Sequence, residues 1–254
     1  MANVFDRYGI KEVADVTFYS LDENEQRGAP VLYLDTLKVS TIEQTAENAE
    51  ARGGKGNAAL ISWDFGKEIT VTLEDALYSP KSLALIYGDD NASPEELTSE
   101  NHGILKTLWS ATSTFSSING SGKTVVTKIN GTDITLTECK FYDANGTELT
   151  TAPTKGSDFN YVTGKMPVES AFKIDITANS FPGTYYVTGD TFARNEANGK
   201  DEFFQFIIPK AKVMSESNTI TMEAEGDPTV FTMNLKVLRP RDGVMMKLVQ
   251  YNVN

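Results

Sequence analysis

The sequence predicts a mainly β protein: an antiparallel β-sandwich with a long β-hairpin and one or two short flanking helices. Apolar and polar residues alternate in several runs, as they do in half-buried strands. Four Asn-Gly pairs, a strong signal for tight hairpin turns, occur in the chain, and three of them lie between residues 115 and 150. Long helical periodicity is absent. Together these observations favour an all-β architecture.

The long hairpin is predicted from residues 31–39 and 60–74. Between Ile61 and Leu73 the odd positions are apolar apart from Lys67, and the even positions are polar or small. One face of this strand should pack on the core and the other should meet solvent. Gly66 is a candidate bulge, because the run is much longer than an ordinary strand.

Residues 41–58, between these two strands, are predicted to form a polar loop that orders on contact with another subunit. The spacing of Ser40 and Glu43 fits a helix capping box, so a helix over residues 41–52 is one alternative. Such a helix would have almost no apolar stripe. A loop that is only solvated is the other alternative.

Two helix starts follow. Ser79-Pro80 combines an N-cap with a first-turn proline and predicts a short helix ending at Gly88. Ser93-Pro94 repeats this signal, with acidic residues in the first turn.

The remaining runs read as strands. Residues 104–165 predict a meander of short strands, and further strands are expected at residues 172–176 and 185–187. The C-terminal part predicts three consecutive strands, at residues 202–209, 219–225 and 229–238, with Gly226-Asp227-Pro228 as the last turn. We expect residues 1–88 and 166–254 to form one sandwich core. Residues 89–165 are either an inserted or peripheral β-meander or part of the same domain.

Composition narrows the class of function. The 35 acidic and 23 basic residues give a net charge of −12, which argues against gripping nucleic-acid phosphates or anionic lipid. No run approaches the roughly 18 apolar residues of a spanning helix. Cys139 is the single cysteine, so an internal disulfide is excluded. We expect no secretion signal and assembly in a reducing cytoplasm.

The candidate catalytic and metal-binding motifs are weak. Gly120–Thr124 resembles part of a phosphate-binding loop, but Ser117 replaces the first glycine and a strand follows. His102 is the single histidine and lies in a loop, and Cys139 lacks a nearby base. Residues 143–148 and 196–202 contain only fragments of a calcium loop. The sequence therefore predicts no catalytic residue, no cofactor and no metal, although carboxylate pairs for glycoside hydrolysis stay open because they meet only in the fold.

Three segments resemble the major tail tube proteins of long-tailed bacteriophages. They are the C-terminal run from Pro209 to Leu238, the Arg52–Asn57 loop with the strand at 61–74, and the helix opening at Ser79-Pro80. The region 89–165 has no matching element. The resemblance implies a β-sandwich with a flanking helix, of which six copies form a ring around a continuous β-barrel. Rings would stack into a hollow tube through which the genome passes during ejection.

The resemblance also implies roles for particular residues. The polar side of the long hairpin would face the channel, whereas pattern alone would favour an ordinary half-solvated sheet. The candidate lumen-facing residues are Asp35, Ser62, Asp64, Glu68, Thr70, Thr72 and Glu74. The candidate inter-subunit loop residues are Glu43, Glu47, Glu50, Arg52, Lys55 and Asn57.

The implied partners are further copies of the chain, in homohexameric rings and a helical stack. A tail sheath or tail terminator and baseplate proteins are expected next to them, viral DNA would pass without specific binding, and no membrane is involved. The protein would be a non-enzymatic component of the virion tail. Two alternatives stay open: another phage structural component, such as a capsid cement, outer-head or baseplate protein, and a carbohydrate-binding module using Trp109 and Tyr185-Tyr186 as stacking platforms.

Overall fold

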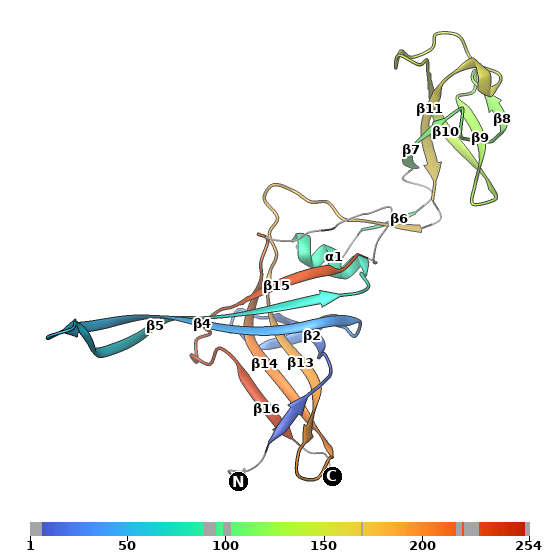
Figure 1. Ribbon diagram of the computed structural model, residues 1–254. Coiled ribbons are helices and arrows are strands. Elements are labelled where there is room, and N and C mark those ends of the chain that lie inside the picture. The colour runs from blue at the N-terminus through green and yellow to red at the C-terminus, as the bar shows by residue number, and fades with distance from the viewer. Residues whose placement is uncertain are drawn as a thin grey trace. The chain divides into compact units, whose positions relative to one another are not determined.

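The computed structural model describes residues 7–88, 95–98, 103–168, 170–216, 220 and 229–251. The chain divides into two compact units (Figure 1). Unit 1 consists of residues 1–94 and 174–254, and unit 2 of residues 95–173. In the described part of the chain, no helix is both long and apolar enough to cross a membrane.

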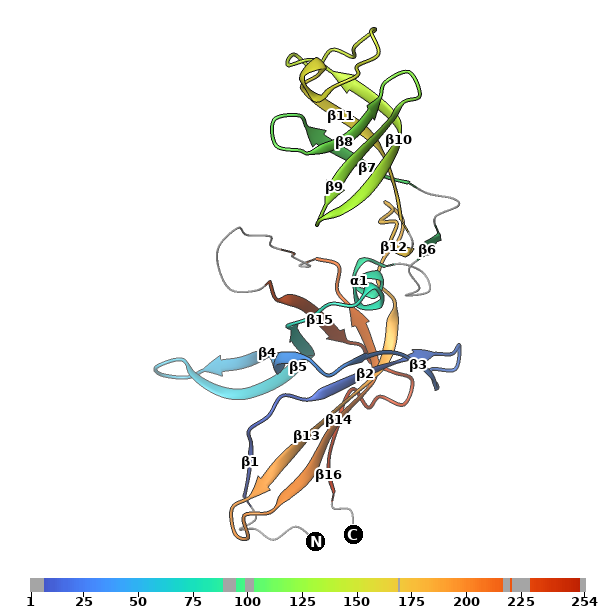
Figure 2. The same cartoon turned by 90° about the vertical axis from the view of Figure 1, so that its right-hand side faces the viewer.

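Unit 1 is built on one nine-stranded antiparallel sheet with the order β3-β2-β13-β14-β15-β5-β4. This order contains seven of the nine strands, and the other two lie off it: β1 pairs with the end of β13, and β16 pairs with the first half of β14. Figures 1 and 2 show β13 and β14 running steeply across the direction of β2, β4 and β5. The strands are β1 (Tyr8–Ile10), β2 (Asp15–Leu21), β3 (Arg27–Leu34), β4 (Leu37–Gly53), β5 (Ala58–Asp75), β13 (Thr184–Asn195), β14 (Asp201–Val213), β15 (Phe231–Val237) and β16 (Lys247–Tyr251).

The core of unit 1 comes from the apolar positions of these alternating runs. Val16 and Phe18 of β2, Val71 of β5 and Leu235 of β15 are fully buried in one cluster. Helix α1 (Pro80–Tyr87) adds Leu85 and Ile86 to the same cluster. The alternation therefore places one face of each central strand in a shared core.

Helix α1 begins and ends as its sequence predicts. The Ser79 hydroxyl accepts a hydrogen bond from the Ser82 backbone N–H at 3.0 Å, and the Ser82 hydroxyl accepts one from the Ser79 backbone N–H at 2.9 Å. This reciprocal capping box satisfies backbone donors that the first turn leaves free. The helix ends at Gly88, which has the left-handed backbone conformation of a C-cap.

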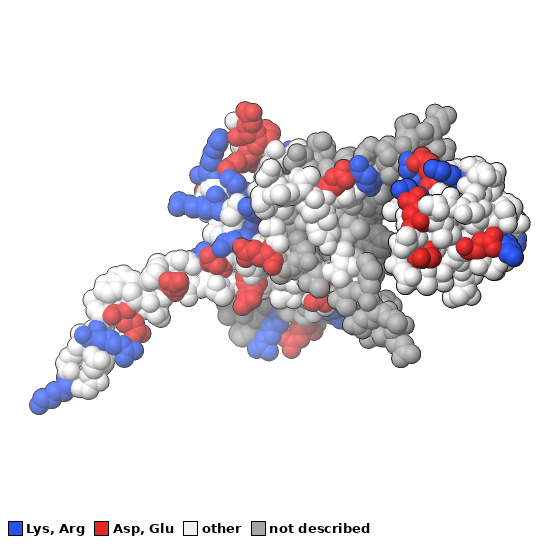
Figure 3. Space-filling view, turned by 90° about the horizontal axis from the view of Figure 1, so that it is seen from above, with Lys and Arg blue, Asp and Glu red and all other residues white. Residues whose placement is uncertain are grey.

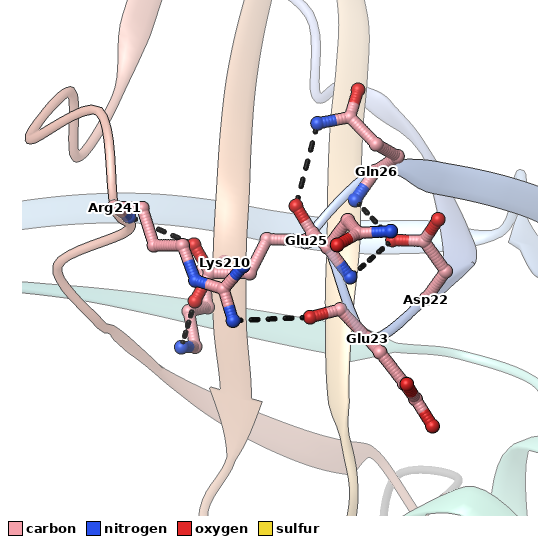
Figure 4. Close-up of polar contacts among 7 residues, drawn as sticks. Asp22, Glu23, Glu25, Gln26, Lys210 and Arg241 are labelled. Atoms are coloured by element: carbon pink, nitrogen blue, oxygen red, sulfur yellow. Dashed lines mark hydrogen bonds and ion pairs between the residues drawn. The ribbon is translucent and has the colours of Figure 1, made fainter.

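A polar clamp holds the β2–β3 turn against the C-terminal part of unit 1 (Figure 4). Glu25 accepts from the Lys210 ammonium of β14 at 2.6 Å and from the Arg241 backbone N–H at 2.8 Å. The Arg241 guanidinium donates to the Glu23 carbonyl at 3.2 Å. The Lys210 hydrogen bond is the largest of the contacts that hold the pKa of Glu25 below its usual value. The Glu25 and Lys210 side chains are 18% and 27% exposed, so the pair is largely shielded from water.

Unit 2 contains a five-stranded antiparallel sheet with the order β7-β11-β10-β9-β8 and a separate pair, β6 with β12. Strand β10 pairs with β9 through its first half and with β11 through its second half, with a register shift around Glu138. Unit 2 has a small hydrophobic core of its own, which includes Val125, Leu136 and Phe159. The elements are β6 (Glu95–Thr98), β7 (Gly103–Trp109), β8 (Phe115–Asn119), β9 (Thr124–Ile129), β10 (Thr132–Tyr142), a 3-10 turn (Gly156–Asp158), β11 (Tyr161–Pro167) and β12 (Ser170–Lys173).

The predicted fold class is confirmed: the chain is mainly β and antiparallel, with one long hairpin and a short α-helix among the described residues. The Asn-Gly turns lie where tight turns are needed. At the β9–β10 turn, Asn130 and Gly131 have φ of 50° and 83°, as the favoured two-residue turn requires. The Gly120–Thr124 segment joins β8 to β9, which confirms a hairpin turn in place of a phosphate-binding loop.

Four element predictions need correction. Residues 41–53 are neither loop nor helix but part of strand β4. The predicted partner of the 61–74 run, residues 31–39, is also corrected: β4 pairs with this run, and β3 pairs with β2. The second helix is wrong, since residues 95–98 form β6 in a backbone ladder with β12; Ser93 and Pro94 lie outside the described residues. The strand expected at 172–176 ends at Lys173. The predicted strand at 219–225, apart from Ile220, and the turn at 226–228 also lie outside the described residues.

Candidate assembly surface

The distal part of the β4–β5 hairpin, residues 45–68, is the most unusual surface of unit 1, and we call it the arm. Strand β15 pairs with β5 only from Thr70 to Asp75, so beyond Thr70 the two strands of the hairpin pair with each other alone. At about 3.3 Å per residue, residues 45–53 extend the arm by roughly 25–30 Å. Figures 1 and 2 show it reaching beyond the other strands of unit 1.

The arm ends in a glycine-rich turn. Gly54, Gly56 and Asn57 all have positive φ, and the Asn57 backbone N–H donates to the Gly54 carbonyl at 3.2 Å. The residues predicted as a flexible loop at this point, Lys55 and Asn57, therefore lie in a closed hairpin turn.

A bulge at Gly66 controls which side chains share a face of the arm. Thr45 lies opposite Glu68, and Glu47 lies opposite Phe65, so β5 has one more residue than β4 between these pairs. Gly66 takes up this extra residue with φ of 62°. Residues opposite each other in a ladder share a face, and Thr45 and Glu47 share one because they are two apart. Phe65 therefore lies on the same face as Glu68, although simple alternation would place it on the other.

The apolar stripe of β5 consequently has two different environments. On the core side of the bulge, Ile69, Val71 and Leu73 are 4%, 0% and 1% exposed. On the distal side, Phe65 and Trp63 are 50% and 54% exposed. Ile61 and Leu60 continue the distal stripe at 54% and 68% exposure. Large apolar side chains thus line the arm without cover inside unit 1.

Charged side chains of both signs lie near the end of the arm, and Glu47, Asp64, Lys67 and Glu68 lie farther from it. Arg52 is paired with Glu50 of the same strand, and its Nε donates to the Glu50 carboxylate at 2.8 Å. Lys55 is exposed in the turn. Figure 3 shows the arm as a narrow projection with a mixed group of basic and acidic side chains toward its tip and further acidic side chains nearer the rest of unit 1.

Next to the arm, the face of β5 and β15 that points away from the core is polar. The Lys236 ammonium pairs with the Glu68 carboxylate at 2.9 Å, and the Thr72 hydroxyl donates to the Asn234 side chain at 2.9 Å. Thr70 and Glu74 lie on this same face, opposite Lys236 and Thr232. We call this surface the threonine face. Because a lysine offsets a glutamate here, it is less negative than the hairpin sequence alone indicates.

The backbone of the arm is also open to pairing. Strand β4 ends the sheet order on one side and β3 ends it on the other. In the described part of the chain the distal half of β5 pairs only with β4. Unpaired strand edges attract further strands.

The predicted lumen-facing residues divide into three groups. Glu68, Thr70, Thr72 and Glu74 share the threonine face. Ser62 and Asp64 lie opposite Glu50 and Asn48, beyond the bulge, and therefore on the other face of the hairpin, so their predicted grouping with Glu68 is wrong. Asp35 lies exposed in the connection between β3 and β4 and is among the carboxylates that raise the pKa of Tyr33, after burial and Asp15.

The predicted inter-subunit residues all lie in β4 or in the turn at the end of the hairpin. Glu43, just before the arm, and Glu47, Glu50 and Arg52 within it belong to strand β4 and are exposed. The sequence interpretation missed Ile61, Trp63 and Phe65, which it assigned to the core. Lys67, a charged residue within the apolar run beside Gly66, was the available signal that the buried stripe ends there.

The candidate chemical groups do not come together. Cys139 is buried, and burial raises its pKa, which opposes thiolate formation. Asp143 accepts from the backbone N–H groups of Asn145 and Thr147 at 2.8 Å, which completes a turn. Among the described residues, no group of three or more His, Cys, Asp or Glu could hold a metal ion. His102 lies outside the described residues.

Comparison with known protein families identifies the chain. Residues 8–250 match the YomU/Tube protein family. The chain belongs to this family. It is a phage tail tube family, so the resemblance to tail tube proteins is confirmed, and membership implies a structural role in the virion tail. No curated protein matches the chain.

Proposed function

We propose that this tube family member is the repeating subunit of a long phage tail tube, in which six copies close a ring and the rings stack helically around a channel for the genome. The observation that carries the proposal is the arm, which has exposed large apolar side chains and open strand edges and is therefore incomplete without a partner. Further copies of the chain are the partner that tube assembly supplies.

Covering the arm would supply much of the assembly energy. Fully burying a Phe or Ile side chain stabilises by about 1.5–3 kcal/mol, and Ile61, Trp63 and Phe65 are each about half exposed in the free subunit. Aromatic side chains in apolar stripes are typical interface anchors. The polar residues Glu47, Glu50 and Arg52 would form the rim of this contact. Strand pairing along β4 would add backbone hydrogen bonds and cover an edge that otherwise favours aggregation.

The threonine face is our candidate for the channel wall. Short hydroxyl side chains and a lysine already paired with Glu68 would give passing DNA few cations to grip, since Lys212 of β14, opposite Lys236, is the exposed lysine next to this face. We keep Asp35, Glu68, Thr70, Thr72 and Glu74 as candidate lumen residues. Ser62 and Asp64, on the other face of the hairpin, are proposed to meet a neighbouring subunit.

The remaining partners follow from this assignment. A tail sheath or tail terminator and baseplate proteins would contact the tube, DNA would pass without specific binding, and assembly would take place in the host cytoplasm. Catalysis has no part in this proposal.

Negative-stain electron microscopy of the concentrated chain tests the proposal. We expect hollow tubes or six-fold rings from the intact chain and neither from the double variant Trp63→Ser/Phe65→Ser. Leu105→Ser, in unit 2, is the matched control because Leu105 is 73% exposed and lies away from the arm in sequence and sheet. Circular dichroism should show the same β content for all three.

Two outcomes would count against a tube. Monodisperse monomers or trimers of the intact chain, at low and at high salt and with an added tail initiator, would favour a cement, outer-head or baseplate protein. Tubes that still form from the double variant would show that the arm is not the assembly surface.

A further inference from the structure

Unit 2 carries a row of aromatic side chains on the face of its sheet opposite the core. Trp109 of β7, Tyr161 of β11 and Tyr142 of β10 lie directly across from one another in register. The ring centroids of Trp109 and Tyr161 are 5.0 Å apart, and those of Tyr161 and Tyr142 are 4.9 Å apart. The neighbouring residues Leu108, Val162 and Phe141 point into the core, so the row lies on the outer face.

The three rings are not equivalent. Tyr142 and Tyr161 are nearly parallel, with an interplanar angle of 13°, so each covers part of the face of the other. Trp109 is tilted by 47° against Tyr161 and is 57% exposed. Among the described strands, β7 is the end of the five-stranded sheet. The tyrosine stack therefore supports an indole that has a free surface at the sheet edge.

Hydrogen-bonding groups border the row of rings. The backbone of Glu148 forms an isolated β-bridge with Tyr142 on the side away from Tyr161. Because bridge partners share a face, the row of rings ends in a carboxylate. The adjacent row on the same face consists of Thr107, Thr163 and Lys140, and Lys140 pairs with Glu148 at 3.3 Å. The turn after Trp109, closed by the Ser113 N–H to the Trp109 carbonyl at 3.0 Å, is rich in serine and threonine.

We propose that this surface binds carbohydrate, with the apolar C–H face of a sugar ring stacked on Trp109 and its hydroxyls bonded to the neighbouring side chains. Sugars combine a flat apolar face with a rim of hydroxyl donors and acceptors, and a rigid row of aromatic rings bordered by carboxylate, ammonium and hydroxyl groups matches both. Single-stranded nucleic acid also stacks on aromatic rings, but it needs cations along its backbone. Lys140 and Lys165 on this face are instead paired with Glu148 and Glu138.

This inference revises one of the sequence alternatives. Trp109 and Tyr185-Tyr186 were the two candidate stacking platforms. Tyr185 packs edge-on against Phe18 of the unit 1 core, and Tyr186 packs edge-on against Tyr19. Trp109 is the one with a free surface. The proposal concerns unit 2 and is independent of how unit 1 assembles.

The two tryptophans of the chain, Trp63 in the arm and Trp109 in unit 2, make a direct test possible. In the full-length Trp63→Phe variant, Trp109 is the only indole, and its fluorescence reports binding. The probes are chitohexaose, cellohexaose, mannohexaose and sonicated peptidoglycan. We expect a saturable change in emission with at least one of them.

Variants of the bound surface then locate the site. For the same probe, measured by calorimetry, Trp109→Ala should weaken binding at least about tenfold, because ring stacking and burial are both lost. Trp109→Tyr should restore part of the affinity, and Glu148→Gln should weaken it. Leu105→Ser, an exposed substitution on the same strand, should have no effect.

Three results would overturn the proposal. They are the absence of saturable binding to all four probes, unchanged binding in Trp109→Ala with its β content intact, and a loss of tube assembly in Trp109→Ala without any effect on sugar binding. The last result would make the row a contact between copies of the chain. Loss of tubes in the arm variant concerns only the proposed tube assembly and leaves the sugar-binding test unaffected. Failure of the one proposal can therefore be told apart from failure of the other.

Discussion

Gly66 shows how one residue determines which face of the hairpin is apolar. The extra residue on β5 places Phe65 on the same side as Glu68, while Ile69, two positions along from Lys67, returns to the core. In the arm, Trp63 and Phe65 therefore lie on one side of the hairpin. Closer to the core, this same side forms the threonine face. The bulge has a positive φ at position 66, and glycine adopts this conformation at little steric cost because it has no Cβ atom.

Cysteine pairs in the arm test this arrangement directly. Positions 47 and 65 lie opposite each other, and the Cα atoms of such a pair are about 4.5–5.5 Å apart, which suits a disulfide. We expect Glu47→Cys/Phe65→Cys to lose two free thiols on mild oxidation, counted after denaturation. The control Asn48→Cys/Phe65→Cys should keep both thiols, because with the bulge these two positions are not opposite each other. Without the bulge they would be partners. The native Cys139, which is buried and free, contributes one further thiol to the count of each variant. Rapid oxidation of the control pair instead would contradict the bulge.

At Glu25 the expected effect depends on pH. The Lys210 hydrogen bond lowers the folded-state pKa of Glu25, so its contribution to stability is present above the unfolded pKa, about 4.3. That contribution is lost as the pH falls through the lower folded-state pKa. Glu25→Gln should therefore lower the urea midpoint at pH 7, and the difference from the parent should shrink by pH 3. Glu23→Gln is the control, because Glu23 joins the clamp through its backbone carbonyl. An equal loss at both pH values would indicate that charge at Glu25 is unimportant.

At the scale of the element, β5 is one strand with two functions. Its core half is held between β4 and β15 and buried, whereas its distal half pairs only with β4. An alanine pair separates the two. Leu73→Ala, at a position that is 1% exposed, should cost about 2–5 kcal/mol of unfolding free energy. Ile61→Ala, at 54% exposure on the same strand, should cost less than about 1 kcal/mol. Urea unfolding of the dilute chain, followed by circular dichroism, measures both. Similar costs would mean that the arm packs within its own subunit.

The same strand shows what sequence alone can and cannot predict. Alternation from Ile69 to Leu73, the capping signal at Ser79 and the turn at Asn130-Gly131 are local features, and each predicts the element that the structure contains. Whether Trp63 and Phe65 are covered depends on how far the rest of the sheet extends, which no local pattern encodes. Residues 41–53 lack an apolar stripe and were interpreted as a loop for that reason. They form a strand because β5 supplies a backbone ladder along their length, interrupted only by bulges.

At the scale of the whole molecule, the two units have separate hydrophobic cores and separate candidate functions. The arm and the threonine face belong to unit 1, and the aromatic row belongs to unit 2. The resemblance read from the sequence has no element in residues 89–165, whereas the family match runs through both units, over residues 8–250. If the proposed tube forms, it carries one unit 2 for every subunit, so that even weak binding of a polymeric sugar would gain from multivalency.

Removing unit 2 tests whether the units fold and act separately. Glu95 and Lys173 are partners in the β6–β12 ladder, so their Cα atoms lie only about 5 Å apart and a short Gly-Ser link can replace residues 96–172. We expect the shortened chain to keep one cooperative calorimetric transition, and the intact chain to show a second one from the unit 2 core. The shortened chain should still form tubes, because the arm is intact, and should no longer bind the sugar probe. A matched Trp109→Ala full-length chain should bind the sugar at least about tenfold more weakly while keeping both transitions. If the shortened chain failed to fold, the two cores would depend on each other, and if it folded without forming tubes, unit 2 would have to contribute to the contacts between subunits.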